Sequence, residues 1–245
     1  MYYLYKINVI MKFYVDIGYT NIKIMSSEHD LQIYSVSKDN LQQIIKLAQN
    51  NNFIYIMNNN VVLQEILEQL AEQYKQIHLI TTTEILSKLN LSDEFNKAEI
   101  GLDLLILMLY LKINNFENAL LISCGSANVC LIWKQHNLYS VSINLGMELS
   151  QQSIAEKLYL PNVCEVNLQR GVNTLSALSL GNYLMLDGLI KSNRQIFNLE
   201  QDYCVLTGNT FNHETVQLLS EKNENVQYQT NLVLQTLKQV YGNLD

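Results

Sequence analysis

A short sequence pattern occurs twice in this chain of 245 residues, and it limits the possible folds more than any other feature. Residues 16–21 (DIGYTN) follow an apolar segment near the start, and residues 123–128 (SCGSAN) follow another more than 100 residues later. In both strings a glycine with small hydroxyl neighbours lies between two segments of β-strand pattern, which is typical of a hairpin turn. The repeat therefore predicts two domains of related topology.

The apolar pattern around these strings alternates between strand and helix spacing. Strands are expected over residues 12–16, 20–25, 31–36, 53–57, 78–82, 119–123, 129–133 and 138–143, and helices over residues 41–47, 62–70 and 102–112. We therefore expect an α/β protein with one domain over residues 11–115 and a second over residues 116–245. Residues 1–10 precede Met11 and the first expected strand, so they are a candidate upstream extension that carries no functional expectation.

Charge and cysteine content argue against several classes of function. The chain has 16 basic and 23 acidic residues, a net charge of −7, whereas a nucleic-acid-binding domain normally carries a basic surface. The four cysteines form no C-x-x-C pair, so we expect no zinc site and reduced, buried thiols in a cytoplasmic protein. The longest apolar run, Leu104–Leu111, is much shorter than the ~20 residues of a membrane span. We expect a soluble protein with neither nucleic acid nor membrane as its partner.

The apolar run also bears on assembly. A helix over Leu104–Leu111 is apolar on every side, which predicts that it is buried at a domain or subunit interface. We therefore expect a homodimer, or a heteromer with a related subunit, packed through this region.

The two glycine turns are candidates for binding phosphate. Neither G-x-x-x-x-G-K-[ST] nor G-x-G-x-x-G occurs in the chain. A glycine turn can nevertheless approach a phosphate closely, its amides and the Thr20 hydroxyl can donate hydrogen bonds, and Asp16 can hold magnesium through water. The predicted nucleotide-binding residues are Asp16, Gly18, Thr20, Asn21, Gly125, Ser126 and Asn128.

Two such turns, one in each half, resemble the superfamily of acetate and sugar kinases, heat-shock proteins and actin. Further strings narrow the resemblance to type III pantothenate kinase. The family's D-x-G-N-T, G-x-D-R, D-x-G-T-A-x-T-x-D and G-G-x-I-x-P-G strings are resembled in order by residues 16–20, 101–104, 123–131 and 140–146. Its later threonine with a following glycine, its T-G-G strand end and its L-V-L-x-G-L string are resembled by Thr174 with Gly181, by residues 207–209 and by residues 232–237. The resemblance spans residues 12–240.

This resemblance implies two actin-like ATPase or ribonuclease-H-like domains with a nucleotide cleft between them. It implies phosphorylation of pantothenate to 4'-phosphopantothenate, the first step of coenzyme A biosynthesis, with ATP and Mg²⁺ as cofactors. Asp103 would be the catalytic base that takes the proton of the pantothenate hydroxyl, and Asp16 would hold the metal. The implied substrate-binding residues are Gly101, Asp103, Gly146 and Thr174.

Several positions depart from the family's strings. Leu104 replaces an arginine that grips the pantothenate carboxylate, and a buried charge-assisted hydrogen bond of that kind contributes roughly 1.5–3 kcal/mol. Ser123 and Leu131 replace acids tied to magnesium or a monovalent cation, which argues against a K⁺ or NH₄⁺ requirement. Tyr19 replaces an asparagine, and residues 140–141 (Ser-Val) replace a glycine pair.

Three interpretations therefore remain open. The chain could be a divergent but active kinase that retains Asp103, Asp16 and Thr174. It could instead be a catalytically impaired subunit that completes the site of a related partner. The third is a ligand-binding or regulatory module that uses the fold without phosphoryl transfer.

Overall fold

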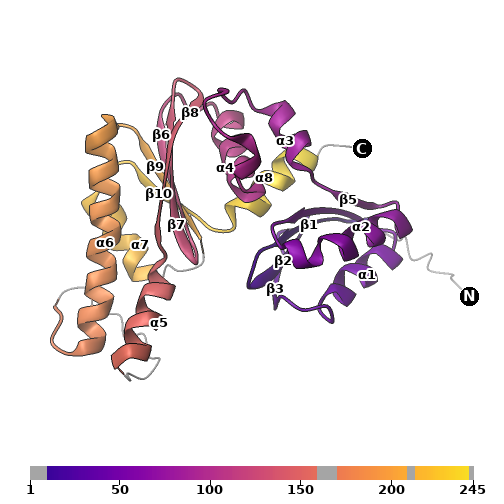
Figure 1. Cartoon of the computed structure of the whole chain (residues 1–245), viewed down its shortest axis with the longest axis horizontal. Coiled ribbons are helices and arrows are strands. Elements are labelled where there is room, and N and C mark those ends of the chain that lie inside the picture. Colours follow the sequence, from indigo (N-terminus) through magenta and orange to yellow (C-terminus); the bar gives the residue numbers. More distant parts are fainter. Residues whose placement is uncertain (1–9, 159–169, 209–212, 243–245) are drawn as a thin grey trace, which may run out of the picture. The chain divides into compact units, whose positions relative to one another are not determined.

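The structure is a computed structural model that describes residues 10–158, 170–208 and 213–242 (Figure 1). The chain divides into two compact units. One contains the residues up to Tyr110 together with those from Val233 onward, and the other contains the residues between them. Each unit contains one mixed sheet of five strands.

The first unit is built on a sheet with the strand order β3-β2-β1-β4-β5. Its strands are β1 (Lys12–Ile17), β2 (Asn21–Ser26), β3 (Leu31–Ser35), β4 (Phe53–Asn58) and β5 (Ile77–Leu79). Its helices are α1 (Leu41–Gln49), η1 (Val61–Leu63), α2 (Gln64–Gln73), α3 (Thr82–Lys88), η2 (Lys97–Glu99), most of α4 (Leu102–Ile113) and α8 (Leu232–Tyr241). Apolar residues of α1 and α2 at helical spacing, such as Ile44 and Leu67, share a core with Val15 and Ile56 of the sheet.

The second unit has the strand order β10-β9-β6-β7-β8. Its strands are β6 (Ala119–Cys124), β7 (Ala127–Lys134), β8 (Asn137–Leu145), β9 (Tyr203–Gly208) and β10 (Val226–Gln229). Its helices are α5 (Met147–Leu158), α6 (Thr174–Phe197) and α7 (His213–Lys222). Leu186 and Ile190 of α6 and Leu219 of α7 pack on the apolar face formed by β6, β7 and β9.

The two sheets have the same topology, which confirms the expected pair of related domains. In the first, β1 pairs antiparallel with β2 and parallel with β4. In the second, β6 pairs antiparallel with β7 and parallel with β9. Asp16 and Ser123 are both the penultimate residue of the central strand, so the two glycine turns begin at equivalent positions.

The structure differs from the sequence-based expectations at several element ends. The strand expected over residues 78–82 ends at Leu79, because Thr81 begins a helix that the sequence analysis did not predict. The Thr81 hydroxyl oxygen accepts a hydrogen bond from the Glu84 amide at 3.2 Å, which is the usual N-cap arrangement. Strand β7 also begins earlier than expected, at Ala127.

The C-terminal helix α8 groups with the first unit, whereas we expected all residues from 116 onward in one domain. Lys238 donates through Nζ to the Ser27 carbonyl at 2.7 Å. The Tyr241 ring stacks on Tyr55 with centroids 4.9 Å apart, and its hydroxyl hydrogen bonds to Glu84. These contacts join residues far apart in the sequence, so local pattern gives no sign of them.

Helix α4 contains the apolar run on which the expected subunit interface depended. Residues 105–109 and Leu111 are already buried within the single chain. The apolar character of the helix therefore does not require a partner subunit, and an interface through it stays a prediction. Among the described residues, no helix is both long and apolar enough to cross a membrane.

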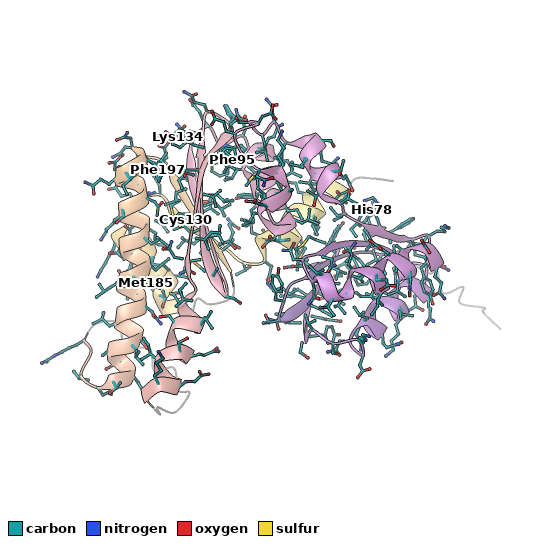
Figure 2. The ribbon with its side chains drawn as sticks, in the orientation of Figure 1. His78, Phe95, Cys130, Lys134, Met185 and Phe197 are labelled. Carbon is teal, nitrogen blue, oxygen red and sulfur yellow. The ribbon has the colours of Figure 1, made fainter. Side chains whose placement is uncertain are left out.

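The three described cysteines agree with the expectation of buried, reduced thiols. Cys124, Cys130 and Cys204 are buried and form no disulfide, and Cys130 of β7 is labelled in Figure 2. Burial raises the pKa of Cys130 to about 11 and that of Cys204 to about 12, so these thiols stay protonated at neutral pH. Cys164 lies outside the described residues.

Gly208, the last residue of β9, occupies a position that only glycine fits well. Its φ is +126°, and a Cβ there would lie 1.8 Å from the carbonyl oxygen of Cys124 on the neighbouring strand. By contrast, a Cβ at Gly125 would meet its nearest neighbour, the Ala127 carbonyl oxygen, at 3.9 Å. The end of the second sheet therefore depends on close approach of two backbones.

We expect Gly208→Ala to destabilise the second unit by about 2 kcal/mol or more, since it adds both backbone strain and a clash. Gly125→Ala, in the adjacent turn, is the matched control and should change stability little. Urea unfolding followed by the fluorescence of Trp133 measures this effect, because the single tryptophan of the chain is buried in β7 of the same sheet. Equal midpoints for the two variants would contradict the close approach.

Candidate functional site

Asp16 is the acidic residue at the end of the central strand of the first unit. Its side chain is 15% exposed and lies 3.7 Å from Lys23 Nζ. Lys23 is directly opposite Asp16 in the β1–β2 register, which explains the pairing. The pKa of Asp16 is raised to about 6, chiefly by burial; the positive charge of Lys23 lowers it, and the negative charge of Asp103 adds a smaller increase.

Asp103 therefore lies close enough to Asp16 for the two carboxylates to repel each other. Asp103 is in the first turn of α4, where the positive end of the helix dipole favours a carboxylate. Gly101 precedes the helix, and a Cβ there would lie 2.6 Å from Asp103 Oδ1. The glycine thus leaves room for the carboxylate against the start of the helix. The structure brings together three predicted residues, Asp16, Gly101 and Asp103.

Hydrogen bonds fix the backbone of the first glycine turn. The Gly18 amide donates to the Asn21 carbonyl at 3.0 Å, and the Val36 amide donates to the Thr20 carbonyl at 2.9 Å. The Asn60 side chain, which caps η1, donates to the Gly18 carbonyl at 3.5 Å. The Thr20 hydroxyl accepts a hydrogen bond from the Asn21 side chain at 3.3 Å.

The first turn therefore leaves its polar side chains accessible. Tyr19 and Thr20 are exposed and Asn21 is half-buried. The Thr20 hydroxyl remains available to donate a hydrogen bond, and a phosphate contact through it stays a prediction.

The second glycine turn is held by the backbone of the segment that follows β8. The Gly125 amide donates to the Ala127 carbonyl, and the Gly146 amide donates to the Ser126 carbonyl, both at 3.0 Å. A Cβ at Gly146 would lie 2.0 Å from the Gly125 carbonyl oxygen, so this glycine is needed for the contact. Gly125, Ser126 and Gly146, which were predicted from different strings, thus form one structure at the end of the second sheet.

Asn128, the second residue of β7, lies directly after this turn. It is fully buried, and its side-chain amide donates to the Leu145 carbonyl at 3.3 Å. Its Oδ1 atom is buried without a hydrogen-bond partner. We therefore expect Asn128 to shape the turn rather than to contact a nucleotide directly. Gly208 lies at the same end of the sheet, and its carbonyl accepts a hydrogen bond from the Tyr228 hydroxyl at 2.7 Å.

Thr174, the other predicted substrate-binding residue, is the first residue of α6. The helix begins with a capping box in which the Asn173 side chain accepts from the Ser176 amide at 2.8 Å. Thr174 itself is exposed. No hydrogen bond among the described residues joins Thr174 to the second glycine turn, and its role in substrate binding stays a prediction.

The structure also shows where the residues that depart from the family's strings lie. Ser123 occupies in β6 the position that Asp16 occupies in β1, so the second unit presents no carboxylate there. Leu131 is fully buried in β7, where an acid would be costly. Leu104 is half-buried beside Asp103 in α4.

Three residues near these turns were missed by the sequence analysis. They are Lys23, Asn60 and Tyr228. Lys23 could have been found, because a hairpin that turns at Gly18 places it opposite Asp16. The contacts of Asn60 with Gly18 and of Tyr228 with Gly208 depend on the pairing of distant strands, and no local signal predicts them.

No group of three or more His, Cys, Asp or Glu side chains within the described part of the chain could hold a metal ion alone. The pair of Asp16 and Asp103 still fits magnesium. This ion is usually bound through one or two carboxylates, with waters and substrate phosphates completing its coordination. A divalent cation would also offset the burial of the Asp16 carboxylate, the main cause of its raised pKa, and its repulsion by Asp103.

Comparison with known proteins shows similarity in structure rather than in sequence. No protein-family model and no curated protein sequence matches the chain. A solved structure of a Campylobacter jejuni protein assigned to the Baf family of transcriptional activators has 17% identity and a TM-score of 0.61, with 94% of this chain and 97% of that chain covered.

Two further solved structures give the same result. A protein of Listeria monocytogenes assigned as an N-acetylmannosamine kinase has 12% identity and a TM-score of 0.54, with 93% and 97% of the two chains covered. MreB5 of Spiroplasma citri, bound to ADP, has 7% identity and a TM-score of 0.53, with 96% of each chain covered. The chain therefore has the two-domain α/β fold of the actin-like ATPases.

Proposed function

We propose that this chain is an ATP-dependent kinase of a small hydroxyl-bearing substrate, and that the substrate is pantothenate. The observation that carries the proposal is the Asp16 and Asp103 pair, because phosphoryl transfer to a hydroxyl needs one acid for the metal and one for the proton. The proximity of the two carboxylates supports the reaction type. The resemblance of residues 101–104 and 140–146 to the strings of type III pantothenate kinase supports the substrate.

In the proposed reaction the substrate hydroxyl oxygen attacks the terminal phosphorus of ATP, its proton passes to Asp103, and ADP leaves. Asp103 acts as the general base, and a positioned general base typically contributes about 10²–10⁴-fold to the rate. Backbone amides of the Gly18 turn would bind phosphate oxygens, as glycine turns do in other phosphate sites, and the family resemblance implies a similar role for the Gly125 turn. The turns need little rearrangement, since hydrogen bonds already fix them.

Asp16 is the residue that would hold Mg²⁺, directly or through water. The bound ion would neutralise developing charge on the phosphates. Because the pKa of Asp16 is about 6, the carboxylate is mostly ionised at neutral pH and can serve as a ligand. Lys23, which pairs with Asp16 at 3.7 Å, would then be released to interact with a phosphate oxygen.

A second candidate function is that of a catalytically impaired subunit or ligand-binding module. The observation that favours it is the pair of replacements Leu104 and Ser123, which removes a substrate cation and a carboxylate while leaving both turns intact. Such a chain would bind nucleotide without turnover. Measuring ATP consumption with pantothenate, with and without a related subunit from the same genome, separates the two candidates.

The role of Asp103 predicts a specific kinetic effect. Asp103→Asn should lower turnover about 10²–10⁴-fold while leaving nucleotide affinity nearly unchanged, since the amide cannot accept the proton. Asp93→Asn is the matched control, because Asp93 is an exposed acid that pairs only with Lys97 among the described ion pairs. The measurement is 4'-phosphopantothenate formation alongside nucleotide binding.

Gly101→Ala tests the same role without removing the acid. Its added Cβ would displace the Asp103 carboxylate, so turnover should fall although every acid remains. Unchanged turnover in Asp103→Asn would remove Asp103 from the mechanism.

The pKa of Asp16 predicts a dependence of stability on pH. A carboxyl whose folded pKa lies above its unfolded value binds its proton more tightly in the folded state, so stability is lost as pH rises from about 4 to about 6. Asp16→Asn removes the charge and should stabilise the protein by up to about 3 kcal/mol near pH 8, but by almost nothing near pH 4.

Urea unfolding at several pH values measures this difference. Asp93→Asn again serves as the control and should give no such gain, because the pKa of Asp93 is lowered by Lys97 rather than raised. A difference between wild type and Asp16→Asn that is the same at all pH values would show that folding does not raise the pKa of Asp16.

Replacing Leu104 tests whether pantothenate is the substrate. Leu104→Arg restores a cation beside Asp103, and one charge-assisted hydrogen bond to the pantothenate carboxylate should tighten binding by about tenfold or more. Leu104→Gln is the control, with a polar but uncharged side chain. If the wild type shows no turnover and Leu104→Arg gains no affinity over Leu104→Gln, pantothenate is not the ligand and the second candidate function is favoured.

A further inference from the structure

The loop between β4 and η1 consists of polar residues whose hydrogen bonds fix its backbone. Asn58 accepts a hydrogen bond from the Asn60 amide through Oδ1 and donates to the Asn60 carbonyl through Nδ2, both at 3.0 Å. The Asn59 amide donates to the Ile17 carbonyl at 2.9 Å, which continues the pairing of β4 with β1 by one residue. These bonds involve only the backbone of Asn60, so the loop does not depend on the Asn60 side chain for its shape.

The Asn60 side chain joins this loop to the first glycine turn. It is almost buried, since Asn60 is 8% exposed. Its Oδ1 accepts a hydrogen bond from the Val62 amide at 3.1 Å, and its Nδ2 makes a long hydrogen bond of 3.5 Å to the Gly18 carbonyl. One neighbour is a donor and the other is an acceptor, so only one orientation of the side-chain amide satisfies both. The NH₂ group is therefore directed at Gly18.

The Gly18 carbonyl belongs to the same peptide unit as the Tyr19 amide. The C=O and N–H groups of a trans peptide point in opposite directions, and none of the described peptide bonds is cis. A Gly18 carbonyl that points to Asn60 therefore turns the Tyr19 N–H away from the loop. Tyr19 is 76% exposed, and its amide has no hydrogen-bond partner among the described residues. An outward amide in a glycine turn is the kind of donor that binds phosphate.

Glycine at position 18 makes a restraint on this peptide unit necessary. Because glycine has no Cβ, the peptide that follows it can rotate at little steric cost. The Gly18 amide donates to the Asn21 carbonyl at 3.0 Å, but that bond fixes the peptide unit before Gly18. Within the described part of the chain, only Asn60 donates to the Gly18 carbonyl. The direction of the Tyr19 amide thus depends on the Asn60 side chain.

We propose that Asn60 is a positioning residue for the phosphate site, which holds the Gly18–Tyr19 peptide so that the Tyr19 amide can donate to a phosphate oxygen of the nucleotide. This proposal rests on the proposed kinase function and adds a residue that acts through the turn without touching the ligand. Without the Asn60 side chain, part of the binding free energy would be consumed in ordering this peptide.

Asn60→Ser separates this role from the capping of η1. Serine is a good N-cap residue and can still accept from the Val62 amide, but its side chain is too short to reach Gly18. We expect this variant to bind Mg²⁺ with ATP about tenfold more weakly, which corresponds to the loss of much of one hydrogen bond to a charged group. In kinase assays the KM for ATP should rise to a similar extent with little change in kcat.

Asn52→Ser is the matched control. Asn52 is also 8% exposed, its Oδ1 accepts from the Met11 amide at 3.1 Å, and its Nδ2 donates to the Leu47 carbonyl at 3.1 Å. It lies at the amino ends of β1 and β4, whereas Asn60 lies beyond their carboxyl ends. Both variants should lower the urea midpoint to a similar extent, because each loses one side-chain hydrogen bond. Only Asn60→Ser should weaken nucleotide binding.

The Tyr19 amide reports on this peptide directly. In protein labelled with ¹⁵N-tyrosine, its NMR signal is the one that Tyr19→Phe removes. Mg²⁺ with ATP, or Mg²⁺ with inorganic triphosphate, should shift this signal in the wild type and in Asn52→Ser at similar ligand concentrations. Asn60→Ser should need about tenfold more ligand for the same shift.

Two outcomes would overturn the proposal, and they differ in what they imply for the kinase function. If Asn60→Ser and Asn52→Ser bind ATP equally well and the Tyr19 signal shifts alike in both, Asn60 has no positioning role, while the nucleotide site stands. If the Tyr19 signal of the wild type responds to neither ligand, the first glycine turn binds no phosphate, and the proposed kinase site fails together with the role of Asn60.

Discussion

The fold of each unit depends on how its central strand is paired. β1 has an antiparallel neighbour on one side and a parallel neighbour on the other, and β6 repeats this pairing. The antiparallel partner forces a tight turn at the end of the central strand, while the parallel partner ends beside that turn. Carboxyl ends of adjacent parallel strands are where α/β sheets bind ligands. The pairing therefore places a glycine turn, twice in one chain, at the sheet edge where α/β proteins commonly bind ligands.

The ends of the two central strands nevertheless differ in chemistry. In the first unit, Asp16 is the penultimate residue of β1 and lies near the charge of Asp103, which makes this end of the sheet acidic. In the second, Ser123 takes the equivalent place, and the backbones of Gly146 and Gly208 crowd against the turn. One edge offers carboxylates and the other offers mainly backbone groups. This difference supports the proposal that a metal is bound by the first unit.

Much of the sheet architecture could be predicted from sequence because strand alternation and glycine turns are local signals. The extent of β1 and the hairpin after Gly18 follow from the residues alone. Local pattern could not show that α8 joins the first unit, since Lys238 and Ser27 meet across most of the chain. Nor could it show that Asp16 and Asp103 are neighbours, which only the family resemblance suggested. Helix α6 escaped prediction for a different reason, because its inward face is polar and gives no ordinary amphipathic signal.

The central claim is that an acidic edge built on Asp16 and Asp103 supports metal-dependent nucleotide binding. Calorimetric titration of the whole chain with ATP, once in excess Mg²⁺ and once in EDTA, tests it most directly. We expect saturable binding with Mg²⁺ that weakens strongly when the metal is removed, because the carboxylates would then repel the phosphates. Absence of binding in both conditions, or equal affinity with and without the metal, would contradict the claim.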